Sequence, residues 1–237
     1  MSTGHTSVGP RLMPGYDHLA RLMGATEMYW RLVAQAAIAT GSTVLEIGCG
    51  TGSVIVRAKT AVPSATAIGL DPDPGSLAVA GRKAAADGLE LRLDQGSATE
   101  LPYADGSADR VLSSLMLHHL PAEQQVPALR EVLRVLAPGG SLHLVDLDVD
   151  PRTPGARPLL LRLLSLLHRL RARPDGPAQH GHGHGHGHGH GHGHGEGRAR
   201  PVLEVLADAG FTAPVTVGHG RTRMGAVTYY RAERGAA

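Results

Sequence analysis

A glycine-rich segment directly after an apolar run holds the residues best suited to binding a ligand. Glu46 lies near the end of that run, and Gly48, Gly50 and Gly52 alternate after it. Glycine lets the backbone turn sharply and approach a ligand without a Cβ clash. The helix expected to follow would offer free N–H groups at its start. This pattern predicts a small-molecule site at a strand-to-helix turn, although a purely structural turn is the alternative.

A glycine-rich turn after a strand also fits a dinucleotide site, so the details of this turn matter. The spacing is Gly-x-Gly-x-Gly, and Ser53 stands where the dinucleotide fingerprint has a third Gly or Ala. We expect Glu46 to place its carboxylate at the mouth of the loop. There it would repel a pyrophosphate but suit a ligand that carries a sulfonium and an ammonium group.

Three further segments place polar or small residues where later predicted strands end. Asp71 closes the next apolar run and precedes Pro72. Its carboxylate can accept hydrogen bonds from both hydroxyls of a ribose, or it can cap the following helix. Ser97 and Ala98 follow the third predicted strand, and Ser114 ends the fourth. All five are candidate cofactor-binding residues.

Two adjacent histidines, His118 and His119, lie just beyond the fourth predicted strand. Imidazole titrates near neutral pH, so either residue is a candidate general base. The alternative is that they only orient the loop. Cys49, the only cysteine, lies inside the glycine-rich loop, where we expect no nucleophilic role, and a single cysteine allows no intrachain disulfide.

A His-Gly dipeptide repeat occupies residues 180–195 and is the only internal repeat. The candidate metal ligands are its eight imidazoles: His180, His182, His184, His186, His188, His190, His192 and His194. Such a chain can wrap Zn²⁺, Ni²⁺ or Cu²⁺. A catalytic metal is not expected, because it would need fixed geometry. The glycines favour disorder, and a neutral expansion in a tolerant loop is the other interpretation.

Helix and strand signals alternate along most of the chain. Strands are predicted at residues 43–47, 66–70, 89–93, 110–113, 141–147, 213–217 and 226–231. Helices are predicted at residues 16–23, 27–39, 53–61, 74–87, from 121 to a stop at 138–140, at 158–173 and at 201–209. This alternation implies right-handed βαβ units and a doubly wound α/β fold with a mostly parallel sheet.

Bulk properties narrow the class of protein. The 237 residues suffice for one α/β domain with a buried core. No apolar run near the start resembles a signal peptide, so we expect a cytoplasmic protein. The leucine-rich stretch 159–170 is too short and too interrupted by arginine for stable membrane insertion. Aromatic residues make up only 3%, so stacking platforms for nucleic acid are scarce.

Taken together, these motifs resemble the class I S-adenosylmethionine-dependent methyltransferases, especially the small-molecule enzymes of ubiquinone and menaquinone biosynthesis. The resemblance rests on residues 44–52, Asp71, residues 101–103 with Asp105 and Asp109, residues 117–120, residues 131–140 and the Tyr16-Asp17 pair. It covers residues 40–150 closely and 200–231 loosely. The resemblance implies a seven-stranded sheet of order 3-2-1-4-5-7-6 with the last strand antiparallel.

The resemblance also implies roles for the candidate residues. Glu46 and the backbone of the three glycines would hold the methionine portion of S-adenosylmethionine, and Asp71 would hold its ribose. Ser97 and Ala98 would lie at the adenine, where the family often has Asp in place of Ser97. Tyr16 would lie on the acceptor side. Methyl transfer is a displacement from a good leaving group, so alignment can supply most of the rate and a base is not required.

The resulting expectation is a methyltransferase acting on a small, apolar or anionic acceptor. Residues 1–40 would form a helical cap, 41–150 the cofactor-binding core, 151–200 an insertion and 201–237 the completion of the sheet. A nucleic-acid substrate is disfavoured, because residues 113–116 lack the Asn/Asp-Pro-Pro-aromatic signature of enzymes acting on base amino groups. The alternative from another class is a metal-binding or metal-sensing protein that uses the His-Gly repeat.

Overall fold

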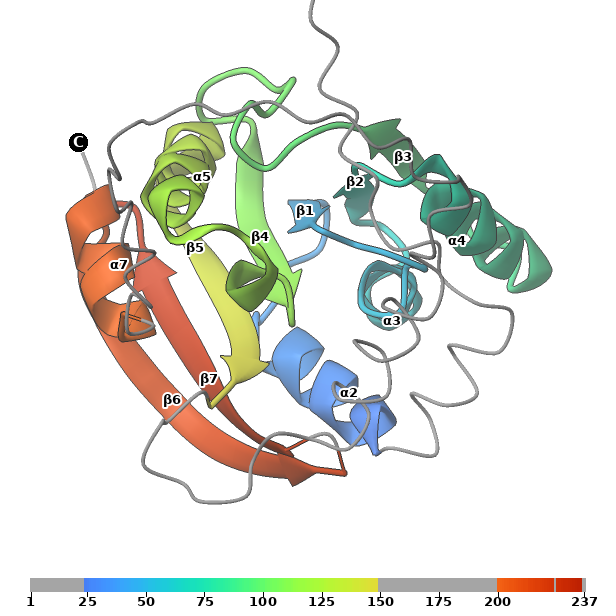
Figure 1. Ribbon diagram of the computed structural model, residues 1–237. Helices are drawn as coiled ribbons and strands as arrows, with labels where there is room; N and C mark the ends of the chain where they lie inside the picture. Colours follow the sequence, from blue (N-terminus) through green and yellow to red (C-terminus); the bar gives the residue numbers. More distant parts are fainter. Residues whose placement is uncertain (1–23, 149–199, 224, 236–237) are drawn as a thin grey trace, which may run out of the picture. The chain divides into compact units, whose positions relative to one another are not determined.

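Seven strands form one sheet in the order β3-β2-β1-β4-β5-β7-β6 (Figure 1). The strands are β1 (Thr43–Ile47), β2 (Thr66–Asp71), β3 (Arg92–Gln95), β4 (Ala108–Ser114), β5 (Leu136–Leu147), β6 (Thr212–Thr222) and β7 (Gly225–Glu233). All pairs from β3 to β5 are parallel, whereas β7 is antiparallel to both β5 and β6. The predicted strand order and the antiparallel last strand are therefore confirmed.

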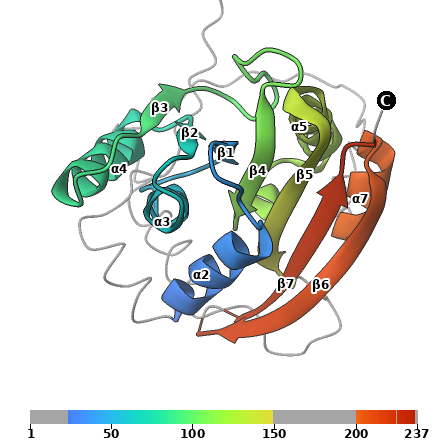
Figure 2. The same ribbon diagram turned by 180° about the vertical axis from the view of Figure 1, so that it is seen from behind.

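The computed structural model describes residues 24–148, 200–223 and 225–235, which all belong to one compact unit. Its helices are α2 (Ala25–Gln35), α3 (Ile55–Ala61), α4 (Pro74–Ala86), the 3-10 helix η1 (Leu117–His119), α5 (Ala122–Val135) and α7 (Val202–Ala209). Helices α2, α3 and α4 lie on one face of the sheet and α5 and α7 on the other (Figures 1 and 2). In the described part of the chain, no helix is long and apolar enough to cross a membrane.

Alternating side chains of the inner strand β1 belong to two different hydrophobic clusters, one on each face of the sheet. Leu45 and Ile47 pack with the buried residues of α5 and α7, whereas Val44 packs with those of α2 and α3. Central parallel strands are covered on both faces, which explains the near-continuous apolar sequence of β1. Glu46 interrupts that sequence, yet it is only 1% exposed. An acid is thereby buried near the end of an inner strand.

The predicted position of the third strand, at residues 89–93, is wrong by about three residues. Helix α4 ends with Gly88 at φ 65°, and the Leu89 N–H donates to the Ala84 carbonyl at 2.8 Å. This is the hydrogen bond that closes a helix through a left-handed glycine. Leu89, the first residue of the predicted strand, therefore finishes the helix cap, and β3 begins only at Arg92.

The predicted stop of the fifth helix at residues 138–140 is also wrong. Helix α5 ends at Val135, and β5 begins with Leu136. The Pro-Gly-Gly segment instead forms an irregularity in β5, since Ala108 pairs with Leu136 but Arg110 pairs with Ser141. A Cβ at Gly140 would lie 2.8 Å from the Ala137 carbonyl oxygen, so only glycine fits at this position of the strand.

Helix α3 starts at Ile55, two residues later than predicted. Several other predictions lie outside the described residues, namely the helices at 16–23 and 158–173, Tyr16 and the His-Gly repeat at 180–195.

Candidate active site

The glycine-rich loop between β1 and α3 has a backbone that only glycine adopts easily. Gly48, Gly50 and Gly52 have φ angles of 64°, 52° and 74°, in the left-handed region. A Cβ at Gly52 would lie 2.8 Å from Cβ of Ala80, and one at Gly48 would lie 2.3 Å from Cγ of Met116. Two of the three glycines are therefore fixed by close packing as well as by conformation.

Glu46 faces the start of α3 and not the open mouth of the loop. Its Oε2 accepts a hydrogen bond from the Ile55 N–H at 2.8 Å. Burial raises the pKa of Glu46 to about 8, and hydrogen bonds from Ile55 and Ser114 oppose that rise. Glu46 thus accepts from an N–H at the helix start that was predicted to be free. Ser114 forms a hydrogen bond with the same acid.

Asp71 lies at the end of β2, beside the glycine-rich loop. Its Oδ2 accepts from the Gly50 N–H at 2.7 Å, and its Oδ1 accepts from the Asp73 N–H at 2.9 Å. The side chain of Asp73 caps α4, so Asp71 is not the helix cap. Burial raises the pKa of Asp71 and the two backbone hydrogen bonds lower it. The carbonyl of Pro72 accepts from Gln95 Nε2 at 3.1 Å, which joins the ends of β2 and β3.

The segment after β3 lies next to the same strand end. The Gly96 N–H donates to the Asp71 carbonyl at 3.2 Å. Ser97 is engaged locally, with its Oγ 2.8 Å from Thr99 Oγ1, and Ala98 is 9% exposed within the core. The structure therefore brings Ser97 and Ala98 to the edge of the sheet that carries Asp71 and the glycine-rich loop.

A histidine–carboxylate pair links the end of β4 to β5. His118 Nδ1 contacts Asp146 Oδ1, and the His118 N–H donates to Asp146 Oδ2 at 3.0 Å. Asp146 is 2% exposed, whereas 21% of the His118 side chain is exposed. A carboxylate accepts hydrogen bonds, so Nδ1 is the donor in this pair, and the neutral form of the imidazole has its lone pair at Nε2. This arrangement orients an imidazole to accept a proton.

His119 has a different environment. Its ring centroid lies 4.0 Å from that of His118, and no carboxylate of the described chain bonds to it. Partial burial and the neighbouring His118 lower the pKa of His119. The two histidines that the sequence left equivalent are therefore distinguished by Asp146. Sequence reasoning missed Asp146, although an acid that ends an apolar strand was the signal that drew attention to Asp71.

A strained residue sets the direction of the segment that carries His118. Leu115 has φ 53°, and its N–H donates to the Val145 carbonyl at 2.8 Å. A bulky residue in the left-handed region costs about 1–3 kcal/mol and persists only where the surroundings impose it. The bend at Leu115 ends β4 and turns η1 toward β5, which brings His118 to Asp146.

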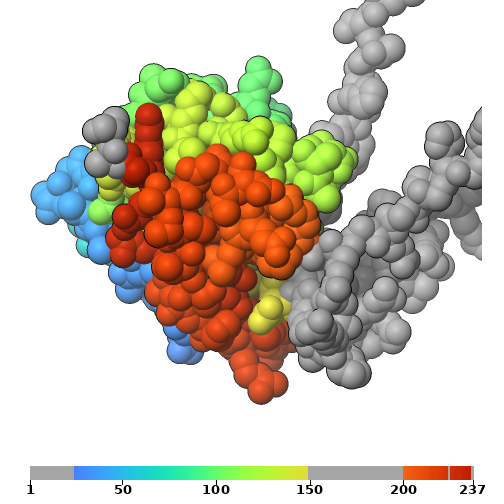
Figure 3. Space-filling view, turned by 90° about the vertical axis from the view of Figure 1, so that its left-hand side faces the viewer, coloured from blue at the N-terminus to red at the C-terminus, as the bar shows by residue number. Residues whose placement is uncertain are grey.

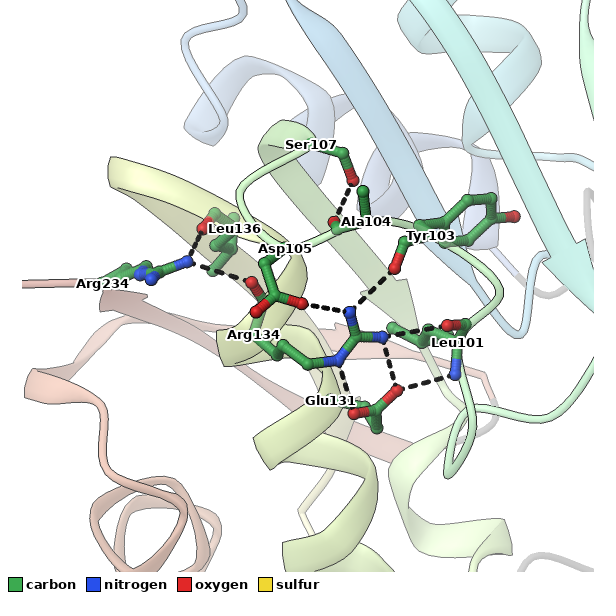
Figure 4. Close-up of polar contacts among 9 residues, drawn as sticks. All are labelled: Leu101, Tyr103, Ala104, Asp105, Ser107, Glu131, Arg134, Leu136 and Arg234. Atoms are coloured by element: carbon green, nitrogen blue, oxygen red, sulfur yellow. Dashed lines mark hydrogen bonds and ion pairs between the residues drawn. The ribbon is translucent and has the colours of Figure 1, made fainter.

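The opposite end of the sheet carries a guanidinium-centred clamp, shown in Figure 4. Arg134 on α5 bonds to the carboxylates of Glu131 and Asp105 and to the carbonyls of Leu101 and Tyr103. The Arg134 guanidinium holds the pKa of Glu131 below its usual range. Because this clamp lies where β4 and β5 begin, we assign it to holding the loop before β4 and not to the site.

Comparison with known proteins identifies the family of this chain. Residues 44–140 match the model of a methyltransferase domain family. A demethylmenaquinone methyltransferase of Thermus thermophilus is 36% identical over 155 residues, which are 64% of this chain and 69% of that protein. One from Lactobacillus johnsonii is 35% identical over 61% of this chain and 60% of its own length. The chain thus spans about two thirds of these relatives.

Solved structures share the fold. Magnesium protoporphyrin IX methyltransferase from Synechocystis PCC 6803, crystallised with S-adenosylhomocysteine, superimposes with a TM-score of 0.59 at 21% identity, covering 96% of this chain and 90% of that one. The fold and the Gly-x-Gly-x-Gly site define a class I S-adenosylmethionine-dependent methyltransferase. The chain belongs to this family, and its curated relatives place it beside the small-molecule enzymes.

Proposed function

We propose that this chain transfers the methyl group of S-adenosylmethionine to a small hydroxylated aromatic acceptor. The observation that carries the cofactor assignment is that the chain's own acids already occupy backbone donors of the glycine-rich loop and of the helix start after it. Glu46 takes the Ile55 N–H and Asp71 takes the Gly50 N–H. A pyrophosphate would meet backbone donors that are already in use and the acid Asp71, whereas the Asp71 carboxylate attracts a sulfonium and an ammonium.

The residues at this edge of the sheet fit the parts of S-adenosylmethionine. Each oxygen of Asp71 accepts one N–H and keeps a lone pair, so the carboxylate can still accept from ribose hydroxyls. The backbone of Gly48, Gly50 and Gly52 would hold the methionine portion, with Glu46 behind it. Ser97 and Ala98 would border the adenine, and Ser114 would orient Glu46.

When bound, S-adenosylmethionine supplies an electrophilic methyl group on a good leaving group. The chain's contribution is proton removal at Nε2 of His118, whose imidazolium Asp146 stabilises. The acceptor gives its hydroxyl proton to Nε2, and the resulting electron pair forms the new bond to the methyl carbon. Transfer of the methyl group would leave the electron pair of the C–S bond on sulfur and would give the methylated acceptor, S-adenosylhomocysteine and a proton that His118 passes to solvent.

Two observations support the proposed class of acceptor. The curated relatives are named for demethylmenaquinone, an apolar oxygenated ring compound. A carboxylate-held imidazole suits an acceptor whose hydroxyl must lose a proton. Residues 1–40, with Tyr16, and residues 151–200 flank the core in sequence, and we propose that they cover the acceptor.

The test is methyl transfer from isotopically labelled S-adenosylmethionine to a reduced demethylmenaquinone analogue, read by mass spectrometry. His118→Ala should lower kcat by about 10²–10⁴, the range of general-base contributions. His119→Ala is the matched control and should stay near the wild type. Asp146→Asn should lower kcat while the affinity for S-adenosylhomocysteine is kept. Equal effects of His118→Ala and His119→Ala would remove the general-base assignment.

Metal binding is the other function that the sequence allows, through the His-Gly repeat at residues 180–195. That repeat lies outside the described residues. Within residues 24–148 and 200–235, apart from 224, no group of three His, Cys, Asp or Glu side chains could hold a metal ion. No structural observation favours this second function, so metal binding by the repeat stays a prediction from its chemistry.

A further inference from the structure

An open pocket lies at the end of the sheet opposite the glycine-rich loop. Figure 3 shows the side of the molecule where α7 and β6 lie next to α5. Gly210 ends α7 with φ 100° and allows a close approach, because a Cβ there would lie 3.2 Å from Leu133 Cδ2. The pocket has a volume of about 490 Å³, within the usual range of small-molecule sites. Its lining includes the arginines Arg130, Arg134 and Arg234.

Two of these arginines have no carboxylate partner. Four acids of this region each bond to an arginine: Glu131 and Asp105 to Arg134, Asp208 to Arg200, and Glu233 to Arg231. Among the described residues, no acid pairs with Arg130 or Arg234. Two like charges in one pocket repel each other, and an anion bound between them would relieve that repulsion.

Backbone carbonyls hold both of these guanidinium groups in place. Arg234 Nη1 donates to the Arg134 carbonyl at 3.0 Å and also to the Leu136 carbonyl (Figure 4). Arg130 Nη2 donates to the Asp208 carbonyl at 3.3 Å. In each group the other two nitrogens bond to nothing in the described part of the chain, so they are able to donate to a ligand. A side chain that is already fixed loses little freedom on binding.

The remaining donor of the pocket is a hydroxyl. All three guanidinium nitrogens of Arg134 are used within its own clamp, so Arg134 is not a ligand. Thr212 lines the pocket, is exposed, and its Oγ1 bonds to no described group. A Cβ at Gly235 would lie 3.2 Å from that Oγ1, which places the hydroxyl beside the segment that carries Arg234.

These donors match one kind of anion. Two guanidinium groups and a hydroxyl offer two positive charges and donors for several oxygens. A phosphate group has a charge near −2 at neutral pH and three acceptor oxygens, whereas a carboxylate has one charge and two oxygens. The chemistry of the pocket therefore favours phosphate over a carboxylate.

We propose that this pocket is a second ligand site, which binds the phosphate group of a small molecule through Arg130, Arg234 and Thr212. Inorganic phosphate and a phosphate monoester share this chemistry. The pocket lies where the parallel strands begin, whereas the glycine-rich loop and Asp71 lie where they end, so the two ligands do not compete. The bound phosphate would join α5 to the segment after β7. This inference does not depend on the identity of the methyl acceptor.

The experiment is calorimetric titration with inorganic phosphate, phenyl phosphate and acetate at constant ionic strength. S-adenosylhomocysteine is present throughout, to keep phosphate away from the glycine-rich loop. The wild type should bind phosphate saturably, with one ligand per chain, and acetate at least about tenfold more weakly. Tighter binding of phenyl phosphate than of inorganic phosphate would assign the site to an organic phosphate, and equal binding would assign it to free phosphate.

Variants of the two exposed donors locate the binding in this pocket. Arg130→Gln should weaken phosphate binding about tenfold to a hundredfold, because charge-assisted hydrogen bonds are lost. Its Tm should stay near that of the wild type, since Arg130 is exposed and makes a single hydrogen bond of 3.3 Å. Thr212→Val should weaken binding severalfold, and Thr212→Ser, which keeps the hydroxyl, should restore it.

Arg82→Gln is the matched control for net charge. Arg82 is exposed on α4, which lies on the other face of the sheet, so its loss removes the same charge without touching the pocket. This variant should bind phosphate as the wild type does. The proposal is overturned if the wild type shows no saturable binding of phosphate, if acetate binds as tightly, or if Arg130→Gln keeps the wild-type affinity. Equal losses in Arg130→Gln and Arg82→Gln would also overturn it, because they would show only a general effect of charge.

Discussion

Three acids at strand ends shape the chemistry at the level of single residues. Glu46, Asp71 and Asp146 close β1, β2 and β5, and each is 9% exposed or less. A buried carboxylate is costly unless it is hydrogen-bonded, and each of these accepts at least one backbone N–H. The chain therefore places three acids, each held by its own backbone, at the edge of the sheet where a cationic cofactor would bind.

Replacing Asp71 tests the ribose contact. Asp71→Ala should weaken binding of S-adenosylhomocysteine by about 1–3 kcal/mol, because charge-assisted hydrogen bonds to the ribose are lost. Isothermal titration calorimetry measures the change. Asp73→Ala is a matched control, because it removes the carboxylate that caps α4 and leaves Asp71 in place. Equal losses of affinity in both variants would assign Asp71 a structural role only.

Replacing Glu46 tests its raised pKa through stability. A folded pKa of about 8, above the usual 4.5, means that the folded state favours the protonated acid. Its contribution is therefore complete below about pH 4.5 and is lost as the pH rises through about 8. Glu46→Gln lacks this loss, so its Tm advantage over the ligand-free wild type should grow with pH, by roughly 2–4 °C for each kcal/mol.

The measurement is thermal unfolding of both proteins across that pH range. A Tm difference that stays constant with pH would show that Glu46 is ionised in the folded protein at neutral pH. Glu131→Gln is a useful comparison at lower pH, because Arg134 lowers the pKa of Glu131. The stabilisation by Glu131 is present above about pH 4.5 and is lost as the pH falls below that value, which is the opposite sign.

Among the elements, local signals predicted most strands and helices but not their mutual placement. The run 43–47 became β1 with the predicted bounds, because its apolar residues and the following glycines agree. The end of α4 and the start of β5 were misplaced where a glycine cap or a glycine-bearing irregularity decides the boundary. The strand order came from the family resemblance and not from periodicity.

In the candidate site, too, some residues could be predicted from the sequence and others depend on tertiary contacts. Glu46 and Asp71 could be named from sequence because each ends a strand beside a recognisable loop. Asp146 also closes an apolar run, but no recognisable loop follows it, and its role depends on the pairing of Ser114 with Val145, which brings β5 alongside the end of β4. His118 and His119 are adjacent in sequence, and only that tertiary contact distinguishes them.

The Arg134 clamp provides a prediction for an element remote from the site. Arg134→Met keeps the aliphatic packing but removes bonds to two carboxylates and two carbonyls. The side chain is 31% exposed, so solvent screening limits the loss to about 1–3 kcal/mol of unfolding free energy. Denaturant unfolding should show this loss while the affinity for S-adenosylhomocysteine stays unchanged. Weaker cofactor binding would mean that the clamp reaches the site.

For the whole molecule, the His-Gly repeat is a sequence feature that lies outside the described residues. Replacing residues 180–195 with a Gly/Ser linker of equal length should leave Tm and cofactor affinity nearly unchanged, since loop-closure entropy depends on length. The same change should abolish most Ni²⁺ binding near neutral pH. In the wild type, that binding should fade as the pH falls through about 6.5, because protonated imidazole cannot ligate.

Calorimetric titration and turnover of the linker variant provide the measurement. If the variant loses methyl transfer, or a chelator stops the wild type, the repeat takes part in the reaction and the neutral-expansion interpretation is wrong.

Cofactor identity is the central claim for the molecule as a whole, and one titration tests it most directly. Isothermal titration of the wild type with S-adenosylhomocysteine and, separately, with NAD compares the two ligand classes that a glycine-rich turn can serve. Because Asp71 and Glu46 already accept hydrogen bonds from the backbone donors at this turn, we expect micromolar binding of S-adenosylhomocysteine and no heat of binding with NAD. Tight binding of NAD with no response to S-adenosylhomocysteine would contradict the account.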